Sequence, residues 1–351
     1  MSFIAKPKVA NPGLPRNSLG LNRRDYEGSM STLCAGCGHD SVTAAIVQAC
    51  FELALPPQSV VKLSGIGCSS KTTAYFVAGA HGFNSVHGRM PSIATGANAA
   101  NRHLRYIGVS GDGDSLSIGL GQLAHAIRRN LDMVYILENN GVYGLTKGQF
   151  SATADKGSKN KKGVVNADSP IDLAALALQL GATYVARSFS GDKEQLVPLI
   201  KGALTHEGAA FIDVISPCVA FNNHEGSTKS FDYVREHNEA VNQLDVITMH
   251  KEITTRYEPG AVQEVRQHDG SVIRLRKIEE KFDPSDRIAA MTYVQSRYAI
   301  GEIVTGLLYF TPKPRDLHGS LNTVPQPLNQ LGERELCPGR AALEKLNESL
   351  R

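Results

Sequence analysis

Residues 108–114 read Gly-Val-Ser-Gly-Asp-Gly-Asp, and residues 137–145 read Leu-Glu-Asn-Asn-Gly-Val-Tyr-Gly-Leu. Each stretch follows a short apolar run that is typical of a buried strand. Asp112 and Asn140 are 28 residues apart, about one strand–helix–strand unit, so we expect both to face one crevice at the carboxyl edge of a parallel sheet. Two glycine-containing turns without a ligand are the alternative, which the pairing of the two stretches at this spacing disfavours.

The residue types in these stretches suit a metal-bound diphosphate. Mg²⁺ prefers a near-octahedral shell of carboxylate, amide, carbonyl and phosphate oxygens. Glycines at 111 and 113 would let backbone N–H groups approach phosphates at a helix N-terminus. The two stretches together resemble the thiamine diphosphate motif, and this resemblance predicts thiamine diphosphate and Mg²⁺ as cofactors.

From residue 39 to residue 216 the chain alternates between helical and strand-like patterns. We expect helices at 39–53, 91–103, 116–130, 171–180 and 193–205, and strands at 60–66, 106–110, 133–138, 183–187 and 210–216. This alternation predicts an α/β fold with a doubly wound, mostly parallel sheet of the thiamine-diphosphate-binding type, followed by a C-terminal extension.

We divide the chain into an N-terminal arm (1–30), a cofactor-binding domain (31–230) and the C-terminal extension (231–351). In the extension we expect a polar helix at 231–254 and a hairpin of 262–266 and 272–276 around a turn at 268–270. A helix at 284–309 and a tail with a short terminal helix follow. We expect this extension to contact the body of the protein or a partner.

Composition excludes some classes of protein. The chain is 42% hydrophobic and 20% charged, with a formal net charge of +3, a surplus too small to suggest a nucleic-acid binder. It has no apolar run of about 18 residues, so we expect no membrane span. The first 20 residues lack the apolar core of a signal peptide, and we expect a cytoplasmic protein.

Four of the six cysteines are expected at one end of the sheet. Cys34 and Cys37 form a C-x-x-C motif before the first helix, Cys68 follows the first strand, and Cys218 follows the strand at 210–216. Four converging thiolates suit a [4Fe–4S] cluster, and a Cys₄ zinc site is the alternative. An electron acceptor beside a bound thiamine favours the cluster. Cys50 reads as a buried helix residue, and Cys337 in the tail is not expected to be a ligand.

With both constellations, the chain resembles the β subunit of 2-oxo acid:ferredoxin oxidoreductases, most closely the two-subunit 2-oxoglutarate type. The resemblance covers about residues 30–230, and the last 120 residues are not matched. It departs from the common pattern in having Cys-Ala-Gly-Cys where many members have Cys-Pro-Gly-Cys, which leaves the ligands intact. The motifs that carry it are Cys34–Gly38, Ile66–Ser69, His87–Arg89 with Ala94–Gly96, Gly111–Asp114 and Asn139–Gln149.

The resemblance implies a role for individual residues. Cys34, Cys37, Cys68 and Cys218 would bind the [4Fe–4S] cluster, and Asp112, Asn140 and the carbonyl of Val142 would bind Mg²⁺. The implied thiamine diphosphate contacts are Ile66, Gly67, Cys68, Ser69, His87, Gly113, Asp114, Gly144 and Leu145. His87 is also a candidate catalytic residue, with a core histidine as the alternative. Lys71 and Lys147 would meet the substrate carboxylates, and a second cation favours a dicarboxylate; solvated surface lysines are the alternative.

The resemblance also implies an activity. It is the coenzyme A-dependent oxidative decarboxylation of 2-oxoglutarate to succinyl-CoA and CO₂, or the reverse, with electrons passed to a separate ferredoxin. The matched motifs contain no suitable glutamate for forming the thiamine ylide, which in this family comes from the α subunit. We therefore expect a chain that is inactive alone and works in a dimer of αβ heterodimers.

Other interpretations remain open. The same family could act here on pyruvate or another 2-oxo acid. A non-oxidative thiamine-dependent decarboxylase with a structural zinc, or a non-enzymatic metal module, would change the class of protein. The basic run at 156–162 is either a solvated loop or a contact for an acidic ferredoxin.

Overall fold

The computed structural model describes residues 13–247, 262–266, 272–277 and 282–351. Its central element is an eight-stranded sheet of order β2-β1-β3-β4-β8-β7-β13-β9. Strands β2, β1, β3, β4, β8 and β7 run parallel to one another, and β13 is antiparallel to β7. The strands are β1 (Val60–Ser64), β2 (His81–Asn84), β3 (Arg105–Gly111), β4 (Met133–Asn139), β7 (Tyr184–Phe189), β8 (Ala209–Ile215), β9 (Asn238–Ala240) and β13 (Ile303–Phe310).

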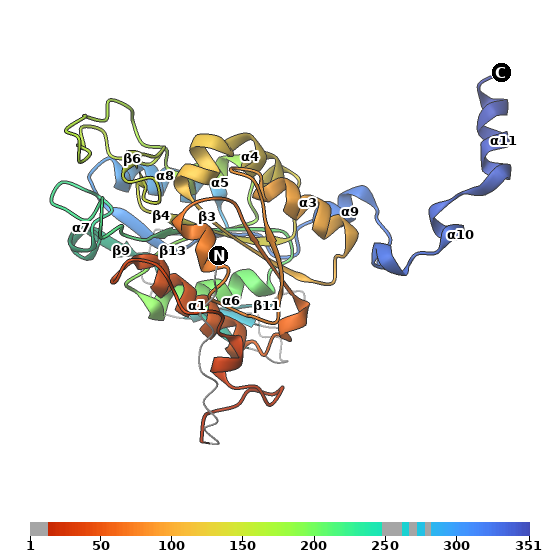
Figure 1. The fold of residues 1–351 in the computed structure, drawn as a ribbon, viewed down its shortest axis with the longest axis horizontal. Helices are drawn as coiled ribbons and strands as arrows, with labels where there is room; N and C mark the ends of the chain where they lie inside the picture. The colour runs from red at the N-terminus through yellow and green to blue at the C-terminus, as the bar shows by residue number, and fades with distance from the viewer. Residues whose placement is uncertain (1–12, 248–261, 267–271, 278–281) are drawn as a thin grey trace.

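Helices cover both faces of this sheet (Figure 1). One face packs its apolar side chains against α1 (Gly38–Glu52) and α6 (Lys193–Thr205), and the other against α3 (Met90–Ala100), α4 (Leu120–Arg128), α5 (Leu173–Leu180) and α8 (Arg287–Tyr298). The parallel strands β1, β4 and β8 are buried along their whole length because helices cover both faces, whereas the edge strand β2 is exposed. The predicted α/β, doubly wound, mostly parallel sheet is confirmed.

Short elements complete the cofactor-binding region. They are the 3-10 turns at Arg23–Tyr26 and Pro57–Ser59, α2 (Cys68–Thr72), the π-helical turn Gly113–Ile118, β5 (Val142–Tyr143) and β6 (Gln149–Phe150). Sequence periodicity missed α2 and β2 because each is too short to repeat a pattern. It also placed one helix at 116–130, where the structure has the π-helical turn and then α4.

Two predicted helices of the C-terminal extension are wrong in part. The region predicted as a helix at 231–254 contains α7 (Phe231–His237), β9 and β10 (Asn242–Ile247), and its remainder lies outside the described residues. The predicted helix at 284–309 is α8 followed by β13, which extends the central sheet. The apolar run Ile303–Phe310 forms a strand where a helix is expected, because a buried apolar run has no decisive period.

The rest of the extension matches its prediction more closely. The strands of the predicted hairpin, β11 (Val262–Arg266) and β12 (Val272–Lys277), pair antiparallel in a three-stranded sheet with β10; the turn residues lie outside the described residues. After α9 (Leu317–Leu321) and a 3-10 turn (Leu328–Gln330), α10 (Glu333–Leu336) and α11 (Gly339–Ser349) project away from the body (Figure 1). In the described part of the chain no helix has the length and apolarity to cross a membrane.

Candidate functional site

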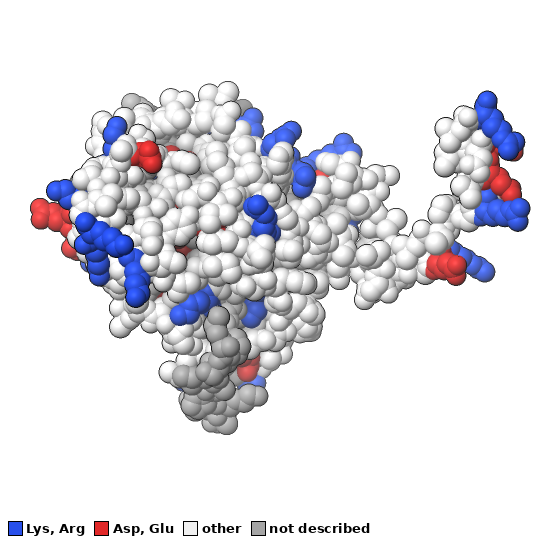
Figure 2. Space-filling view, turned by 45° about the horizontal axis from the view of Figure 1, so that its top comes forward, with Lys and Arg blue, Asp and Glu red and all other residues white. Residues whose placement is uncertain are grey.

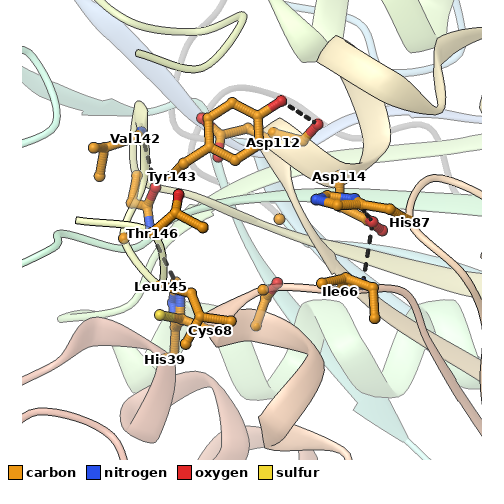
Figure 3. Close-up of a pocket in the computed structure, with 16 residues that line it drawn as sticks. His39, Ile66, Cys68, His87, Asp112, Asp114, Val142, Tyr143, Leu145 and Thr146 are labelled. Carbon is orange, nitrogen blue, oxygen red and sulfur yellow. Dashed lines mark hydrogen bonds and ion pairs between the residues drawn. The ribbon is translucent and has the colours of Figure 1, made fainter. Parts of the chain in front are cut away.

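A cleft opens at the carboxyl ends of β1, β3 and β4, where parallel α/β sheets bind ligands. All nine predicted thiamine diphosphate contacts and all three predicted Mg²⁺ ligands line it. The lining consists of His39, Ile66, Gly67, Cys68, Ser69, His87, Gly111, Asp112, Gly113, Asp114, Asn140, Val142, Tyr143, Gly144, Leu145 and Thr146. The close-up in Figure 3 shows Asp114, His87 and Ile66 on one side of this cleft and His39 with Cys68 on another.

Asp112 is the buried carboxylate at the base of the cleft, 1% exposed. Its Oδ2 atom accepts hydrogen bonds from the backbone N–H of Gly141 (2.9 Å) and the hydroxyls of Ser151 (2.5 Å) and Thr153. Among the described residues these donors all share Oδ2, so Oδ1 is the atom available to a metal ion. Burial raises the pKa of Asp112 above its ordinary value, and a bound cation would oppose that shift.

Asn139 and Asn140 point in opposite directions from the end of β4. The Asn139 amide bridges the Thr153 hydroxyl (2.8 Å) and the Asp213 carboxylate (3.1 Å) inside the protein. Asn140 faces the cleft, and its Oδ1 accepts from the Val142 N–H (3.0 Å), which shapes the turn. Asp112, Asn140 and Val142 all line the cleft, and carboxylate, amide and carbonyl oxygens are a donor set that suits Mg²⁺.

Asp114 holds two loops in place from the start of the π-helical turn. Its Oδ1 atom accepts from the backbone N–H groups of Ile66 (3.1 Å) and Gly88 (2.8 Å) and contacts Nδ1 of His87. Its Oδ2 atom accepts from the hydroxyl of Ser110 (2.6 Å). The carboxylate thus fixes both loops and orients the His87 ring. Asp114 lines the cleft, but both of its oxygens already accept hydrogen bonds from within the chain.

Gly113 is required by the close approach of Tyr143. A Cβ atom at residue 113 would come within 2.5 Å of the Tyr143 ring, whose hydroxyl donates to the Gly113 carbonyl (3.1 Å). The same ring packs edge-on against His87, with centroids 6.3 Å apart. Tyr143 was not singled out from the sequence, although it lies inside the Asn-Asn-Gly-Val-Tyr-Gly motif.

His39 and Thr146 also line the cleft without having been singled out from the sequence. His39 lies at the start of α1, fully buried, with Nδ1 2.6 Å from the Ser216 hydroxyl and Nε2 3.4 Å from the Asn140 amide. Burial lowers the pKa of His39 to about 4, so the ring is neutral at physiological pH. Its position directly after Cys-x-x-Cys-Gly was the signal that could have found it.

Behind His39 lies Glu138, a fully buried carboxyl on the neighbouring part of β4. Its Oε2 atom is 3.5 Å from Nδ1 of His39, and among the described residues neither of its oxygens has a hydrogen-bond partner. Burial raises the pKa of Glu138 well above its ordinary value, and the nearby Asp40 raises it further. Burial thus shifts the equilibrium of this carboxyl toward the neutral acid.

The four predicted cluster ligands lie near one another beside the cleft. A Cβ atom at Gly144 would lie 3.5 Å from both Cys68 Sγ and Cys218 Sγ. Burial raises the pKa of Cys37 to about 12, and burial followed by the nearby Cys218 thiol raises that of Cys68. Burial and the nearby Cys34 thiol also raise the pKa of Cys218. Thiols that oppose one another's ionisation suit a cationic metal centre.

The other cysteines lie elsewhere. Cys50 is buried within α1, as predicted, and Cys337 is exposed between α10 and α11. Among the described residues no three His, Cys, Asp or Glu side chains converge on a single metal-ion position.

The two lysines predicted to meet the substrate do not line the cleft of this chain. Lys71, in α2, directs its ammonium to the carbonyl oxygen of Thr32 (3.1 Å), close to Cys34. Lys147 is exposed, with a backbone φ of +77°, in the turn between β5 and β6. Both border the region that contains the cleft and the cysteines, and their role stays a prediction.

Comparison with known proteins agrees with this geometry. The family model for the thiamine pyrophosphate enzyme C-terminal TPP-binding domain matches residues 65–214. The chain is 45% identical over 191 residues to the 2-oxoacid:ferredoxin oxidoreductase subunit beta of Saccharolobus solfataricus, covering 54% of this chain and 63% of that protein. The chain therefore spans less than two thirds of that relative's length.

Two further relatives are matched over a larger share of their own length. The 2-oxoglutarate synthase subunit KorB of Methanocaldococcus jannaschii is 36% identical over 54% of this chain and 69% of that protein. A solved 2-oxoglutarate:ferredoxin oxidoreductase from Magnetococcus marinus, with 2-oxoglutarate, coenzyme A and succinyl-CoA bound, matches with a TM-score of 0.71 and 30% identity. That match covers 90% of this chain and 94% of that one. Residues 65–214 thus form a thiamine diphosphate-binding domain, and the chain belongs to the family of 2-oxo acid:ferredoxin oxidoreductase β subunits.

Proposed function

We propose that this chain is the thiamine diphosphate-binding subunit of an enzyme that converts 2-oxoglutarate and coenzyme A to succinyl-CoA and CO₂, or runs the reverse reaction. The observation that carries the proposal is the cleft itself. The predicted Mg²⁺ and thiamine diphosphate contacts all line it. Cys68, one of the four predicted cluster ligands, also lines the cleft and lies near Cys218. A carbon–carbon cleavage site and a candidate electron acceptor are therefore adjacent.

The residues present fit the diphosphate and its metal ion. Asp112 Oδ1, Asn140 and the Val142 carbonyl would hold Mg²⁺, and the glycines at 111 and 113 leave room for phosphate oxygens near backbone N–H groups. Thiamine diphosphate, when bound, supplies the carbanion chemistry that separates a 2-oxo carbon from its carboxylate. The chain's own contribution is to orient the cofactor: Asp114 fixes the loops at Ile66 and Gly88 and the ring of His87.

We propose that the cysteine set holds a [4Fe–4S] cluster. Cys34 is exposed and the thiols of Cys37, Cys68 and Cys218 are half-buried, so a centre bound there would lie between the cleft and the surface. A Cys₄ zinc site would draw the four sulfurs to within about 3.8 Å of one another around bonds of about 2.3 Å. A [4Fe–4S] cluster needs its four cysteine sulfurs farther apart than this, because its own iron and sulfide ions lie between them.

A partner subunit is part of the proposal. Within the described residues the lining of the cleft contains no glutamate, and Glu138 lies behind His39. We propose that an α subunit completes the site with the glutamate that assists ylide formation, in a dimer of αβ heterodimers. A ferredoxin would accept the electrons.

The substrate proposal rests on two observations. The relatives include a 2-oxoglutarate synthase subunit and a 2-oxoglutarate:ferredoxin oxidoreductase. This chain also carries two cations, Lys71 and Lys147, at the border of the site, which suits a dicarboxylate better than pyruvate.

The test is reduction of methyl viologen by the anaerobically co-purified complex, with 2-oxoglutarate and coenzyme A as substrates and pyruvate run in parallel. Activity with 2-oxoglutarate and little with pyruvate supports the reaction and the substrate. Activity with pyruvate alone keeps the family and contradicts the substrate. Inactivity with both substrates, from a preparation that contains thiamine diphosphate but no iron, favours a non-oxidative enzyme with zinc.

The location of the iron needs its own experiment. We expect Cys34→Ser and Cys218→Ser each to remove the iron and the [4Fe–4S] absorption of this subunit, while Cys337→Ser leaves both unchanged. Iron that stays with the complex in all three variants would mean that another subunit holds the cluster.

A further inference from the structure

The loop after β6 contains an unusual concentration of positive charge. Lys156, Lys159, Lys161 and Lys162 lie in a short hairpin, residues 156–166, that contains no acidic residue. All four lysines are exposed, as are Val164 (56%) and Val165 (51%). We call this segment the lysine hairpin. In Figure 1 the loop after β6 projects from the body, and Figure 2 shows basic side chains gathered at the left of the face drawn.

The lysine hairpin is an ordered structure. Its two arms are joined by backbone hydrogen bonds from Gly157 to Asn166 (2.8 Å) and from Asn166 to Ser158 (2.9 Å), and by a bridge between Lys159 and Val165. The buried Asn166 side chain donates to the carbonyls of Ala154 (3.0 Å) and Asp155 (3.1 Å). The lysines are thus presented in a defined arrangement.

The hairpin is tied to the segment that carries Cys218. The ammonium of Lys161 lies over the ring of Phe221, 4.4 Å from its centroid. The backbone N–H of Phe221 donates to the carbonyl of Cys218 (3.2 Å), within a single turn. The positive surface therefore begins one side chain, that of Phe221, away from the segment of a proposed cluster ligand.

The charges of the hairpin are not used within the chain. In the described ranges none of its four lysines forms an ion pair, whereas the neighbouring Lys229 is paired with Asp155 (3.2 Å). The net charge of the whole chain is only +3, so the patch is a local feature. A positive patch raises the rate at which an acidic protein associates, and exposed valines beside it offer a small apolar contact.

From this geometry we infer that the lysine hairpin is the docking surface for an acidic electron-carrier protein, an inference that rests on the proposed function. The carrier would bind with its acidic face against Lys156, Lys159 and Lys162. Its redox centre would then approach Cys218 across Phe221. Such an interface is brief and salt-sensitive, which suits a carrier that must leave after each electron.

The test compares two double variants of the assembled complex. Lys159→Glu/Lys162→Glu reverses two charges of the hairpin, and neither side chain has another described contact. Arg128→Glu/Arg129→Glu reverses two exposed charges at the end of α4, at the opposite edge of the sheet. Each complex is assayed with a recombinant acidic 2[4Fe–4S] ferredoxin and with methyl viologen, which needs no protein interface.

We expect the hairpin variant to lose at least about tenfold in kcat/KM for the ferredoxin at low ionic strength, with methyl viologen reduction unchanged. Its ferredoxin rate should also lose most of its salt dependence between about 10 and 150 mM, where the Debye length falls from about 30 to about 8 Å. The α4 variant should behave like the wild type. Equal losses in both variants, or an unchanged ferredoxin rate, would overturn the inference.

Two additional readouts separate this inference from its alternatives. The Kd of the ferredoxin for the complex, measured without turnover, should rise in the hairpin variant even if the complex proves inactive. Inactivity of the wild type with methyl viologen contradicts the proposed function rather than the docking surface. A rise in KM for coenzyme A with an unchanged ferredoxin Kd would assign the lysines to the phosphates of coenzyme A instead.

Discussion

Glu138 Oε2 lies 3.5 Å from Nδ1 of His39, inside the protein. The same Nδ1 atom is hydrogen-bonded to the hydroxyl of Ser216 at 2.6 Å. A buried carboxyl without a hydrogen-bond partner costs about 1–3 kcal/mol. His39 lines the cleft, and Glu138 is near the thiols of Cys37 and Cys68, so this unfavourable group lies next to the proposed chemistry.

We therefore expect Glu138→Met, which is close in volume and has no polar group to satisfy, to raise the free energy of unfolding by about 1–2 kcal/mol. Urea unfolding of the chain at pH 7 measures it. Glu138→Gln is the control, because it keeps a polar group there and should stabilise less. If Glu138→Met destabilises the assembled complex but not the isolated chain, the carboxyl gains a hydrogen-bond partner on assembly.

Gly65 has no room for a side chain because Asp114 lies against it. A Cβ atom there would lie 2.0 Å from Asp114 Oδ2, and Asp114 holds the loops of the cleft. We expect Gly65→Ala to weaken thiamine diphosphate binding more than tenfold, about 1.4 kcal/mol or more, measured by calorimetry with Mg²⁺. Gly96→Ala in α3 is the control: its Cβ would meet nothing within 4 Å, so unchanged binding and slightly higher stability are expected.

Lys62 is a buried lysine of β1 whose ammonium donates to the carbonyl of Phe76 (2.9 Å). Burial lowers its pKa from 10.5 to about 8. Between those two pH values the unfolded chain binds more protons than the folded chain, so this group makes stability rise with pH across that window and contributes no slope below it.

Lys62→Met should therefore be more stable than the wild type at pH 7, by about 1–2 kcal/mol, and the difference should shrink as the pH approaches 10. Unfolding curves at several pH values give the comparison, with the exposed Lys193→Met as the matched control. A difference that stays constant with pH would show that the ammonium keeps its ordinary pKa.

Arg187 is a buried guanidinium that neutralises two carboxylates, donating to Asp213 (2.8 Å) and Asp172 (2.6 Å). Asp213 also accepts from Asn139, next to the proposed Mg²⁺ ligand Asn140. We expect Arg187→Met to destabilise the protein by about 3–5 kcal/mol because it leaves buried charges uncompensated. The double variant Arg187→Met/Asp213→Asn should recover part of that loss in thermal unfolding; no recovery would argue against a charge effect.

Lys71→Ala tests the predicted substrate contact. If Lys71 meets the distal carboxylate, KM for 2-oxoglutarate should rise about tenfold or more, as for the loss of a charged hydrogen bond, and KM for pyruvate should change little. Because its ammonium also donates to Thr32, iron content is measured in the same preparation. Equal effects on both substrates together with lost iron would make Lys71 an anchor of the Cys34 loop.

Local sequence identified the lining of the cleft well. The motifs at 66–69, 111–114 and 139–145 each end a strand of the parallel sheet, and their strands have adjacent places in it. His39 and Tyr143 were missed because a single histidine or tyrosine beside a motif has no spacing rule of its own. Glu138 was missed because its burial depends on α1 covering that face of β4.

The sequence alone determined the class of fold and predicted which oxygen- and sulfur-bearing residues follow the ends of the strands, because strand periodicity, glycine turns and C-x-x-C spacing are short-range properties. Only the tertiary structure decided that β13 and β9 extend the central sheet, that Lys71 reaches Thr32 and that the lysine hairpin lies against Phe221. Each of these contacts joins segments far apart in the chain or in different loops. Their formation depends on the packing of the whole domain rather than on any local pattern.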